Sequence, residues 1–513
     1  MMFGIEVGIK PITVKKTLIF AHRWMGVALC LLFLLWFASG IVMMYWDYPQ
    51  VTAVDRLKHL PPLDGSRVRL SVLEAYGRLG MKTAASQAFL TTFDGRPAYR
   101  FRMGDEQKLV FADDGAVCEE YSPDLALRVA SQWSGHQPNA ARMALLTEED
   151  QWTVSDAFRS LRPLYKFTWP NADEVYVSQE TGQVVQSTSR ASRLGAYFGA
   201  IPHWLYFTPL RKDGLMWTRV VVWTSGLATF AAFIGLIVGV WMYSPSLRYR
   251  RQGVPSGIPY RGQKRLHTIL GLFFGLVACT WAFSGMLSMD PFPMGGEASL
   301  DGTSKIQTAL RGDNVTLAEF LSIHPRDLLA RFASQIGARE IEFASLAGEP
   351  FFIVSSAPQQ TLILTADDLT ASSEFSREKI LGVVRDVGRT AMNQAEIVES
   401  RVVTRYEAYY LDRHHQRPLP ALFIQLNDKH RSMYYIDPKT ARVVEAYDTG
   451  SRWNRWLYHG LHSLNFPWLY EHRPAWDILM LALLVGGTCL CVTSIILAGQ
   501  VLSRKLRERS SQY

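Results

Sequence analysis

Four stretches of the chain contain no charged residue and are long enough to cross a lipid bilayer. They are Trp24 to Trp46, Val220 to Tyr243, Thr268 to Met289 and Ile478 to Leu502. A spanning helix needs roughly 20 mostly apolar residues, whereas the core helices of soluble proteins are rarely so long and so uniformly apolar. The pattern therefore predicts an integral membrane protein with four transmembrane helices.

The two long segments between the spans, residues 47–219 and 290–477, mix helical patterns with short alternating runs. Helical patterns at Ser71–Leu79 and Leu317–Ile336 each precede three runs typical of strands. These runs are Ala88–Phe93, Ala98–Met103 and Lys108–Phe111 in the first segment, and Glu340–Phe343, Pro350–Val354 and Thr361–Leu364 in the second. A second helix-then-strands module follows in each segment. The sequence thus predicts a membrane α-helical fold that carries α+β domains.

The two halves of the chain resemble each other, which indicates two tandem repeats. An offset of 245 aligns the first span with the third, and an offset of 259 aligns the second span and the residues before it with the fourth. The matched pairs include His22 with His267, Ser39-Gly40 with Ser284-Gly285, Val175–Ser178 with Tyr434–Asp437, and His203 with His462. Because both copies enter and leave on one side, a pseudo-two-fold axis along the membrane normal is expected.

The net charge of +8 is concentrated beside the spans, so we expect no nucleic-acid partner and expect membrane lipid instead. The basic residues lie before or at the start of the first span, between the second and third spans, and after the fourth. Short basic flanks stay in the cytoplasm. We therefore expect both termini in the cytoplasm, the two long segments in the periplasm, and a location in the bacterial inner membrane. The first span is expected to be an uncleaved anchor.

This topology divides the chain into eight parts. They are the cytoplasmic N-terminus with the first span (1–46), the first periplasmic domain (47–219), the second span (220–243), a basic cytoplasmic loop (244–265), the third span (266–289), the second periplasmic domain (290–477), the fourth span (478–502), and a basic cytoplasmic tail (503–513).

Four histidines occupy repeat-matched positions at two depths. His22 lies one turn inside the first span, and His267 opens the third. An ionisable group in the bilayer is costly and usually has a functional partner, although an interfacial histidine that reaches toward headgroups is the alternative. His203 and His462 lie in apolar, aromatic segments just before the second and fourth spans, where a surface histidine without a ligand is the alternative.

Two equivalent histidines on either side of a two-fold axis can bind one planar ligand from both faces. Haem with two imidazole ligands suits this arrangement, and helix bundles often hold such sites. We expect His22 and His267 to hold one haem b near the cytoplasm, and His203 and His462 to hold another near the periplasm. A span is about 30 Å long, so one iron cannot serve both depths. A zinc or non-haem iron site is less favoured, because no carboxylate or thiol accompanies these histidines.

His459 breaks the symmetry of the second pair. It precedes His462 by three residues, on the same helical face, and its match in the first copy is Ala200. It is a candidate alternative ligand or a partner of a haem propionate. The chain has no Gly-x-Gly-x-x-Gly loop and no Walker loop, so any electrons must come from a separate, unidentified donor.

Several short motifs, in this order, resemble the PepSY-associated transmembrane helix family. They are His22-Arg23-Trp24-Met25-Gly26 in a span that ends Ala38-Ser39-Gly40, Leu109 to Gly115, Tyr434 to Thr440, and Leu461-His462-Ser463-Leu464. That family includes haem-containing ferric-siderophore reductases of the inner membrane. The resemblance implies PepSY-like periplasmic domains and the reduction of a ferric siderophore or other ferric chelate in the periplasm. PepSY modules also inhibit peptidases, so a membrane-anchored module that binds peptides or regulates a peptidase, without redox chemistry, is the alternative.

Overall fold

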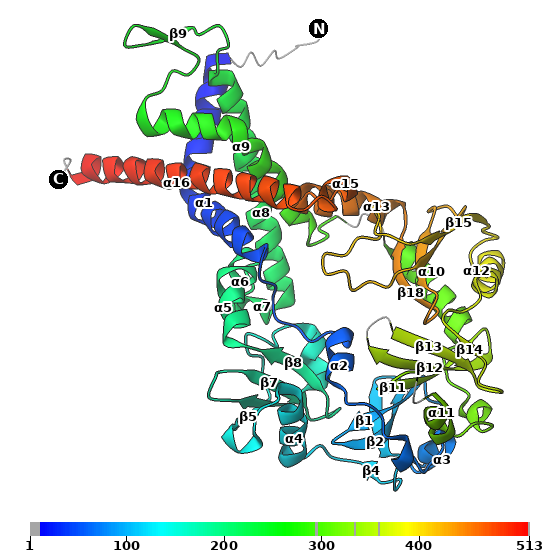
Figure 1. Ribbon diagram of the computed structural model, residues 1–513. Helices are drawn as coiled ribbons and strands as arrows, with labels where there is room; N and C mark the ends of the chain where they lie inside the picture. Colours follow the sequence, from blue (N-terminus) through cyan, green and yellow to red (C-terminus); the bar gives the residue numbers. More distant parts are fainter. Residues whose placement is uncertain (1–10, 293–295, 333–334, 358–359, 511–513) are drawn as a thin grey trace, which may run out of the picture. The chain divides into compact units, whose positions relative to one another are not determined.

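The computed structural model describes residues 11–292, 296–332, 335–357 and 360–510 (Figure 1). The chain forms two compact units, each assembled from segments that are distant in the sequence. One, called here the helical unit, consists of Met1–Tyr48, Ala191–Pro293 and Asn454–Tyr513. The other, called the β-rich unit, consists of Pro49–Arg190 and Met294–Trp453.

The helical unit contains the four helices that the sequence predicts. They are α1 (Pro11–Met43), α8 (Gly214–Met242), α9 (Gly262–Leu287) and α16 (Ala475–Ser510). Within the described residues, these four are long and apolar enough to cross a membrane, with mean hydropathy between 1.8 and 2.4. The prediction of a multi-pass membrane protein is therefore confirmed.

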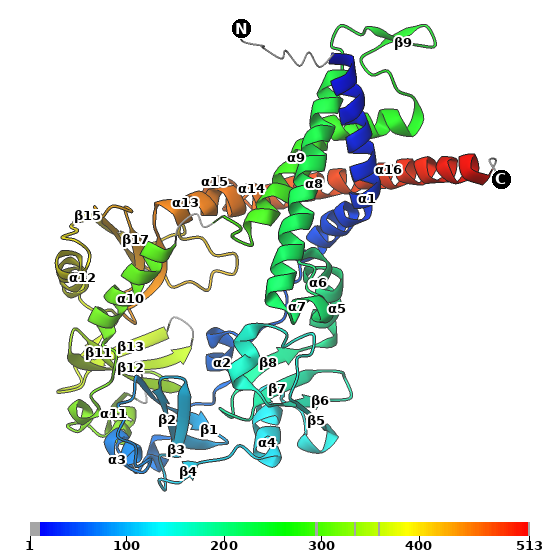
Figure 2. The same ribbon diagram turned by 180° about the vertical axis from the view of Figure 1, so that it is seen from behind.

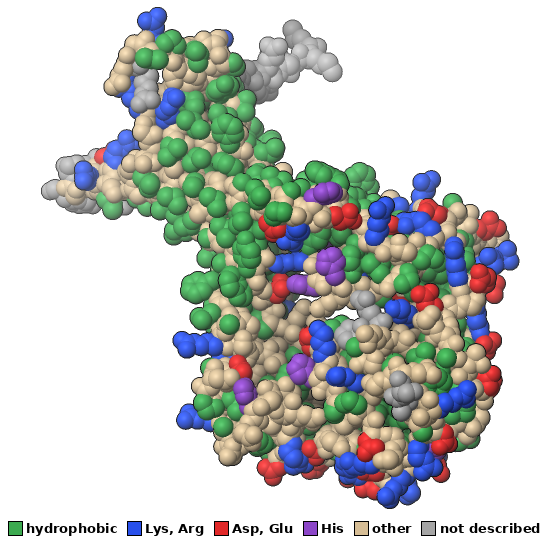
Figure 3. Space-filling view, viewed as in Figure 1, with side chains coloured by type: hydrophobic (Ala, Val, Ile, Leu, Met, Phe, Trp, Pro, Cys, Tyr) green, Lys and Arg blue, Asp and Glu red, His purple; other side chains and the backbone are tan. Residues whose placement is uncertain are grey.

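Small residues allow these helices to pack closely, as is usual in membrane bundles. A Cβ atom on Gly487 of α16 would lie 2.0 Å from Cε1 of Phe37 on α1, and one on Gly486 would lie 2.2 Å from Cε1 of Phe274 on α9. Only glycine permits these contacts. Large apolar side chains such as Phe273 are exposed on the outside of the unit, and Figure 3 shows apolar side chains spread over its surface. This surface suits lipid rather than water.

Short elements connect the long helices. Before α8 come α5 (Arg190–Phe198), α6 (Ala200–His203) and α7 (Thr208–Arg211), and before α16 come α13 (Thr449–Arg455), the π-helix η5 (Trp456–Gly460), α14 (Leu461–Ser463) and α15 (Pro467–Tyr470). A hairpin of β9 (Tyr249–Arg251) and β10 (Val254–Ser256) joins α8 to α9. In Figures 1 and 2, this hairpin and the first turns of α1 lie at the same end of the unit.

An eight-stranded antiparallel sheet is the largest feature of the β-rich unit. Its order is β14-β13-β12-β11-β1-β2-β3-β4. The strands are β1 (Gln87–Phe93), β2 (Arg96–Met103), β3 (Glu106–Phe111), β4 (Val117–Cys118), β11 (Glu340–Leu346), β12 (Glu349–Ala357), β13 (Gln360–Thr365) and β14 (Ala371–Ser372). The six runs predicted as strands all lie in this sheet. Because β1 pairs with β11, with Leu90 opposite Ile341, the two long segments share one sheet.

Two four-stranded antiparallel sheets complete the β-rich unit. One has the order β5 (Arg142–Leu146), β6 (Leu164–Thr168), β7 (Glu174–Ser178) and β8 (Val184–Thr188); the other has β15 (Ile397–Val403), β16 (Ala421–Leu426), β17 (Met433–Asp437) and β18 (Arg442–Tyr447). The helices of this unit are α2 (Ala53–His59), α3 (Val72–Gly77), α4 (Pro123–Ser134), α10 (Glu297–Arg311), α11 (Pro325–Phe332) and α12 (Arg377–Ala391). The two small sheets have the same strand order. Because the β-rich unit combines helices with antiparallel sheets, the predicted α+β character is confirmed.

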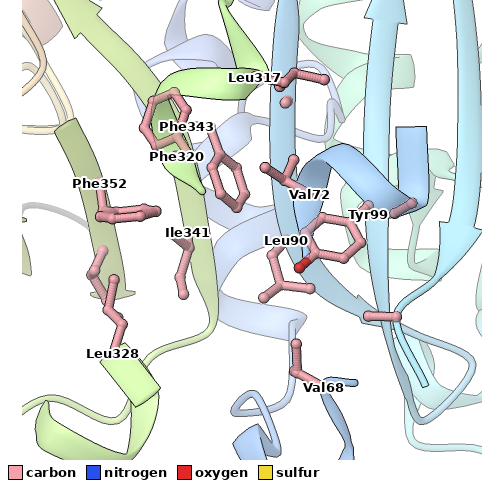
Figure 4. Packing of buried hydrophobic residues seen from close by; sticks show 14 of the residues in the cluster. Val68, Val72, Leu90, Tyr99, Leu317, Phe320, Leu328, Ile341, Phe343 and Phe352 are labelled. Atoms are coloured by element: carbon pink, nitrogen blue, oxygen red, sulfur yellow. The ribbon is translucent and has the colours of Figure 1, made fainter. Parts of the chain in front are cut away.

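The core of the large sheet is aromatic. Phe320, Phe343 and Phe352 pack edge to face, with ring centres 5.2 to 5.5 Å apart, and Figure 4 shows them beside Leu90 and Tyr99 from the neighbouring strands. All five side chains are buried. Edge-to-face aromatic packing contributes about 0.5–1.5 kcal/mol per pair beyond the burial of apolar area.

One predicted helix differs from the structure. Instead of a single helix over Leu317–Ile336, the structure has a 3-10 turn, η4 (Leu317–Phe320), and then α11. Pro325 lacks a backbone N–H and pre-sets the backbone of a first helical turn, so it begins a new helix rather than continuing an old one. By contrast, Ser71 caps α3 by accepting a hydrogen bond from the Glu74 N–H, close to the predicted start.

Candidate functional site

Two of the sequence-predicted histidines face each other between long helices of the helical unit. His22 lies on α1 and His267 on α9. Their ring centres are 6.3 Å apart and the ring planes are inclined by 33°. Each histidine lies in the N-terminal half of its helix, and the structure brings these two rings together from opposite halves of the sequence.

The other two matched histidines also face each other, but they lie on short helices. His203 ends α6, which precedes α8, and His462 lies in α14, which precedes α16. Their ring centres are 5.9 Å apart, and the planes are nearly perpendicular at 75°. A hydrogen bond from Trp217 Nε1 to the Trp204 carbonyl and its counterpart from Trp476 Nε1 to the Ser463 carbonyl hold the two short helices against the long ones.

Hydrogen bonds fix the tautomer of one histidine in each pair. Nδ1 of His22 lies 3.1 Å from the Ala231 carbonyl oxygen, and Nδ1 of His203 lies 3.1 Å from that of Trp36. A carbonyl oxygen can only accept a hydrogen bond, so Nδ1 carries the proton in both rings. Nε2 of each ring therefore holds the lone pair.

The same tautomer follows for the other two rings from hydroxyl groups. Thr493 Oγ1 donates to the Leu490 carbonyl, so it accepts from Nδ1 of His267 at 3.1 Å. Ser284 Oγ donates to the Trp281 carbonyl, so it accepts from Nδ1 of His462 at 3.0 Å. A hydroxyl has a single proton to donate, and here a backbone carbonyl takes it.

All four rings therefore leave Nε2 available for a ligand. Within the described part of the chain, none of these Nε2 atoms has a hydrogen-bond partner. Histidines that bind a metal commonly donate their other N–H to a carbonyl or similar acceptor, which fixes the orientation of the ring. The hydrogen-bond pattern is the one expected of metal-binding histidines.

The separation of the rings also fits one metal ion between each pair. An imidazole nitrogen lies about 2 Å from the metal that it binds, and the ring centre lies roughly 1 Å further on. Two imidazoles on opposite sides of one ion thus have ring centres about 6 Å apart. The observed separations are 6.3 and 5.9 Å. Edge-to-face packing alone would also allow this distance, but it would not require an unpartnered Nε2 on every ring.

A cavity of about 540 Å³ lies beside the first pair. Its lining is mostly apolar and contains both histidines together with small residues from all four long helices: Gly26, Ala231, Gly235, Gly239, Gly271, Gly275, Ala278 and Ala498. A Cβ atom on Gly235 would lie 2.5 Å from Cε1 of His22. Glycine at this position therefore makes room for the ring. The volume is within the range of about 300–1,000 Å³ that is usual for cofactor sites.

The two pairs lie at different levels of the bundle. Ser39, whose hydroxyl lies 3.1 Å from Nδ1 of His203, follows His22 by 17 residues on α1. Ser284, which binds His462, follows His267 by the same 17 residues on α9. At 1.5 Å per residue, this interval corresponds to about 25 Å of helix. One iron cannot bind histidines from both pairs.

Burial keeps the second pair neutral at physiological pH. Removal from water lowers the pKa of His203 to about 4. The pKa of His462 falls to about 3, mainly through burial and further through the neighbouring charge of His203. A neutral imidazole is the form that binds a metal ion, so these two rings need not release a proton before they do so.

The remaining sequence candidates lie outside the pairs. His459 is in the π-helix η5, and its ring packs 4.4 Å from that of Tyr458; among the described residues, the ring that faces His203 is that of His462. His414 and His415 are exposed in the loop before β16. No group of three His, Cys, Asp or Glu side chains within the described residues is arranged to hold a metal ion.

Sequence reasoning missed the residues that orient the histidines. Ser39, Ser284 and Thr493 bind ring nitrogens, and Gly235 makes space for His22. One signal was available, because Ser39-Gly40 matches Ser284-Gly285 at the offset of 245. Polar residues at matched positions inside apolar spans could have been assigned to the histidines that face them.

The backbone acceptors follow the same offsets. Ala231, whose carbonyl oxygen accepts from His22, matches Leu490 at the offset of 259, and the Leu490 carbonyl accepts from Thr493, which in turn accepts from His267. Trp36, which accepts from His203, matches Trp281 at the offset of 245, and the Trp281 carbonyl accepts from Ser284, which in turn accepts from His462. These backbone positions match between the halves, but the hydroxyl acceptor of His267, Thr493, has no counterpart in the first half, where the matched residue is Ile234.

Comparison with known proteins gives one match. The family model described as the PepSY-associated TM region matches residues 20–311, more than half of the chain. The matched part includes α1, α8 and α9, and with them His22, His203 and His267. No curated protein matches the chain.

Proposed function

The chain belongs to the PepSY-associated transmembrane family, and on this premise we propose that it is a haem-binding electron-transfer protein that reduces a ferric siderophore or other ferric chelate. One observation carries the proposal. In two pairs of histidines, the Nε2 atoms have no hydrogen-bond partner among the described residues, and the ring centres are about 6 Å apart, the separation that two imidazoles require around one iron.

Each pair would hold one haem b. His22 and His267 would bind the first haem, and His203 and His462 would bind the second. A haem with two histidine ligands supplies one-electron transfer through its iron without an open position for substrate. The chain contributes the rest: the hydrogen bonds at Nδ1 fix the rings, and mostly apolar side chains line the first site.

The arrangement supports an electron path along the bundle. The two pairs are separated by about 25 Å of helix, most of the thickness of a bilayer. Phe37 and Trp281 pack together with ring centres 5.6 Å apart, and Trp281 lies 6.4 Å from His462. These rings belong to an apolar cluster in the interior of the bundle beside the second pair.

We place the first pair toward the cytoplasm and the second toward the periplasm of the inner membrane. The support is the basic character of one end of the helices, because short basic flanks remain in the cytoplasm. The matched hydrogen bonds of Ser39 to His203 and of Ser284 to His462, at the offset of 245, further support two tandem repeats related by a pseudo-two-fold axis. The electron donor is a separate partner, and the ferric chelate would be reduced at the periplasmic side.

A peptide-binding module remains the second candidate, and the edges of the small sheets favour it. The edge strand β5 exposes Met143 and Leu145, and the edge strand β15 exposes Val398 and Val402. An exposed sheet edge with apolar side chains can accept an added peptide strand. This candidate requires no haem.

The absorbance spectrum of the purified full-length protein separates the two candidates. We expect a Soret band, and low-spin b-type bands after reduction. The reduced protein is then mixed with a ferric hydroxamate chelate, and reoxidation of the bands is followed in time. Folded protein from haem-replete cells that contains no haem would rule out the electron-transfer role and favour the peptide-binding module.

A further inference from the structure

Three basic residues line the cavity beside His22 and His267. They are Arg23, Lys264 and Arg504, and all three are exposed. Among the described residues that line this cavity there is no aspartate or glutamate. The otherwise apolar site thus has a positive margin that suits an anionic group on its ligand.

The three cations that line the cavity come from three different helices. Arg23 follows His22 directly on α1, and Lys264 precedes His267 by three residues, which is about one helical turn, on α9. Arg504 comes from α16. Each of the two helices that carry a histidine of this pair therefore also carries a cation close to it.

Membrane topology alone does not explain why these three cations line the cavity. Basic flanks need only lie on the cytoplasmic side of the spans, and Arg261, Lys505 and Arg507 satisfy that need without lining the cavity. Lys505 is paired with Glu508 at 3.3 Å. In the described part of the chain, by contrast, no carboxylate forms an ion pair with Arg23, Lys264 or Arg504.

From these observations, and resting on the proposed function, we infer that Arg23, Lys264 and Arg504 bind the two propionate carboxylates of the haem held by His22 and His267. Carboxylates placed against an apolar site are costly unless cations pair with them. Arginine binds a carboxylate through two parallel N–H groups, and lysine through a point charge. The three side chains would therefore set which edge of the haem faces the basic end of the bundle.

The test measures the rate at which the purified holoprotein loses haem to excess apomyoglobin. The variant combines Arg23→Gln, Lys264→Gln and Arg504→Gln. Its matched control combines Arg261→Gln, Lys505→Gln and Arg507→Gln, which removes the same charge from the same end. We expect one of the two phases of haem loss to accelerate about tenfold or more in the first variant, since charge-assisted bonds are lost, and neither phase to change in the control.

A second measurement covers the case in which the variant is made without haem. Apoprotein is titrated with haem and with its dimethyl ester, which has no carboxylates. Wild-type protein should prefer haem at this site, and the triple variant should bind both equally. If haem loss and the preference are both unchanged in the variant, the propionate assignment is wrong. If the wild-type protein binds neither compound, or His22→Ala leaves both haems in place, it is the proposed function that fails.

Discussion

The two histidine pairs share a hydrogen-bond pattern but differ in their surroundings. The first lies on long helices beside a cavity of about 540 Å³, with rings inclined by 33°. The second is carried by short helices, its rings are nearly perpendicular at 75°, and a π-helix with His459 precedes it on one side only. Every ring is thus held at Nδ1, but the second pair uses the matched hydroxyls of Ser39 and Ser284, whereas the first pair has no matched hydroxyls and different surroundings.

This difference has a physical consequence for electron transfer. Two haems in identical environments would have the same reduction potential. An electron would then have no preferred direction of transfer between them. If each pair holds an iron, the three cations that line the cavity beside the first pair and the different inclinations of the rings would give the two irons different surroundings. The comparison therefore predicts two haems that can be told apart by mutation and by spectroscopy.

Loss of a ligand should have the largest effect. His22→Ala and His267→Ala should each remove the same haem, and His203→Ala and His462→Ala should each remove the other. The haem content should fall by about one per chain in every single variant, and the double variant within a pair should be little worse, because both residues serve one site. Haem content is measured by the pyridine haemochromogen spectrum.

His459→Ala is the control for that series. Its ring packs against Tyr458 and is not the ring that faces His203, so this variant should retain both haems. If His459→Ala loses a haem while His462→Ala does not, the ligand of the second half is wrong by one helical turn. If His22→Ala and His203→Ala remove the same haem, the assignment of two levels is wrong.

Glycine substitutions should affect the two sites differently, and their effect on haem content should be smaller than that of losing a histidine. In Gly235→Ala the new Cβ would lie 2.5 Å from Cε1 of His22, closer than any normal contact, so the ring must move. In Gly285→Ala the Cβ would lie 3.7 Å from Cε1 of His462, an ordinary contact. We expect the first variant to lose much of the haem at its site and the second to retain its haem. Equal haem contents in the two variants would contradict the positions assigned to these rings.

The hydroxyl acceptors should have a moderate effect. Thr493→Val removes the hydroxyl that accepts from His267, and Ser284→Ala removes the one that accepts from His462. Residues of this kind typically change metal affinity by about 10–100-fold. Thr224→Val is a suitable control, since its hydroxyl binds only carbonyl groups of its own helix. In Thr493→Val and in Ser284→Ala, one phase of haem loss to apomyoglobin should accelerate, and the phase should differ between the two variants. In the control Thr224→Val, neither phase should change.

The ring planes predict the smallest difference, which is spectroscopic. Low-spin ferric haems with nearly perpendicular imidazoles give electron paramagnetic resonance signals with a larger maximum g-value than those with nearly parallel imidazoles. The protein should show two signals, and the one with the larger value should disappear in His203→Ala. Two identical signals would contradict the observed angles of 33° and 75°.

The sequence predicted the features that depend on local patterns. Uncharged stretches revealed the four long helices, and alternation revealed the strands of the large sheet. The sequence also indicated the four matched histidines, because an ionisable residue in an apolar segment is costly. The pairing of β1 with β11 could not be predicted, since strand partners distant in the sequence leave no local signal. The start of a new helix at Pro325 was not predicted, because the residues on both sides of this proline follow one apolar helical pattern.

The details of the site also lay beyond the sequence. The side chain that accepts from His267 is Thr493, which lies 226 residues away. The cavity depends on how glycines from different helices face one another, as Gly235 does toward His22. Contacts of this kind arise from the packing of the bundle, and a periodic pattern in one segment does not contain them.

Electron transfer across a closed membrane tests the central claim most directly. The protein is reconstituted in lipid vesicles with its cytoplasmic face inward, a membrane-impermeant reductant inside, and a ferric hydroxamate with a ferrous-specific chromogenic chelator outside. We expect wild-type protein to form ferrous iron outside, and we expect both His22→Ala with His267→Ala and His203→Ala with His462→Ala to stop it. Wild-type protein that holds two haems but reduces no external iron, or a variant without one pair that reduces it at the wild-type rate, would contradict the account.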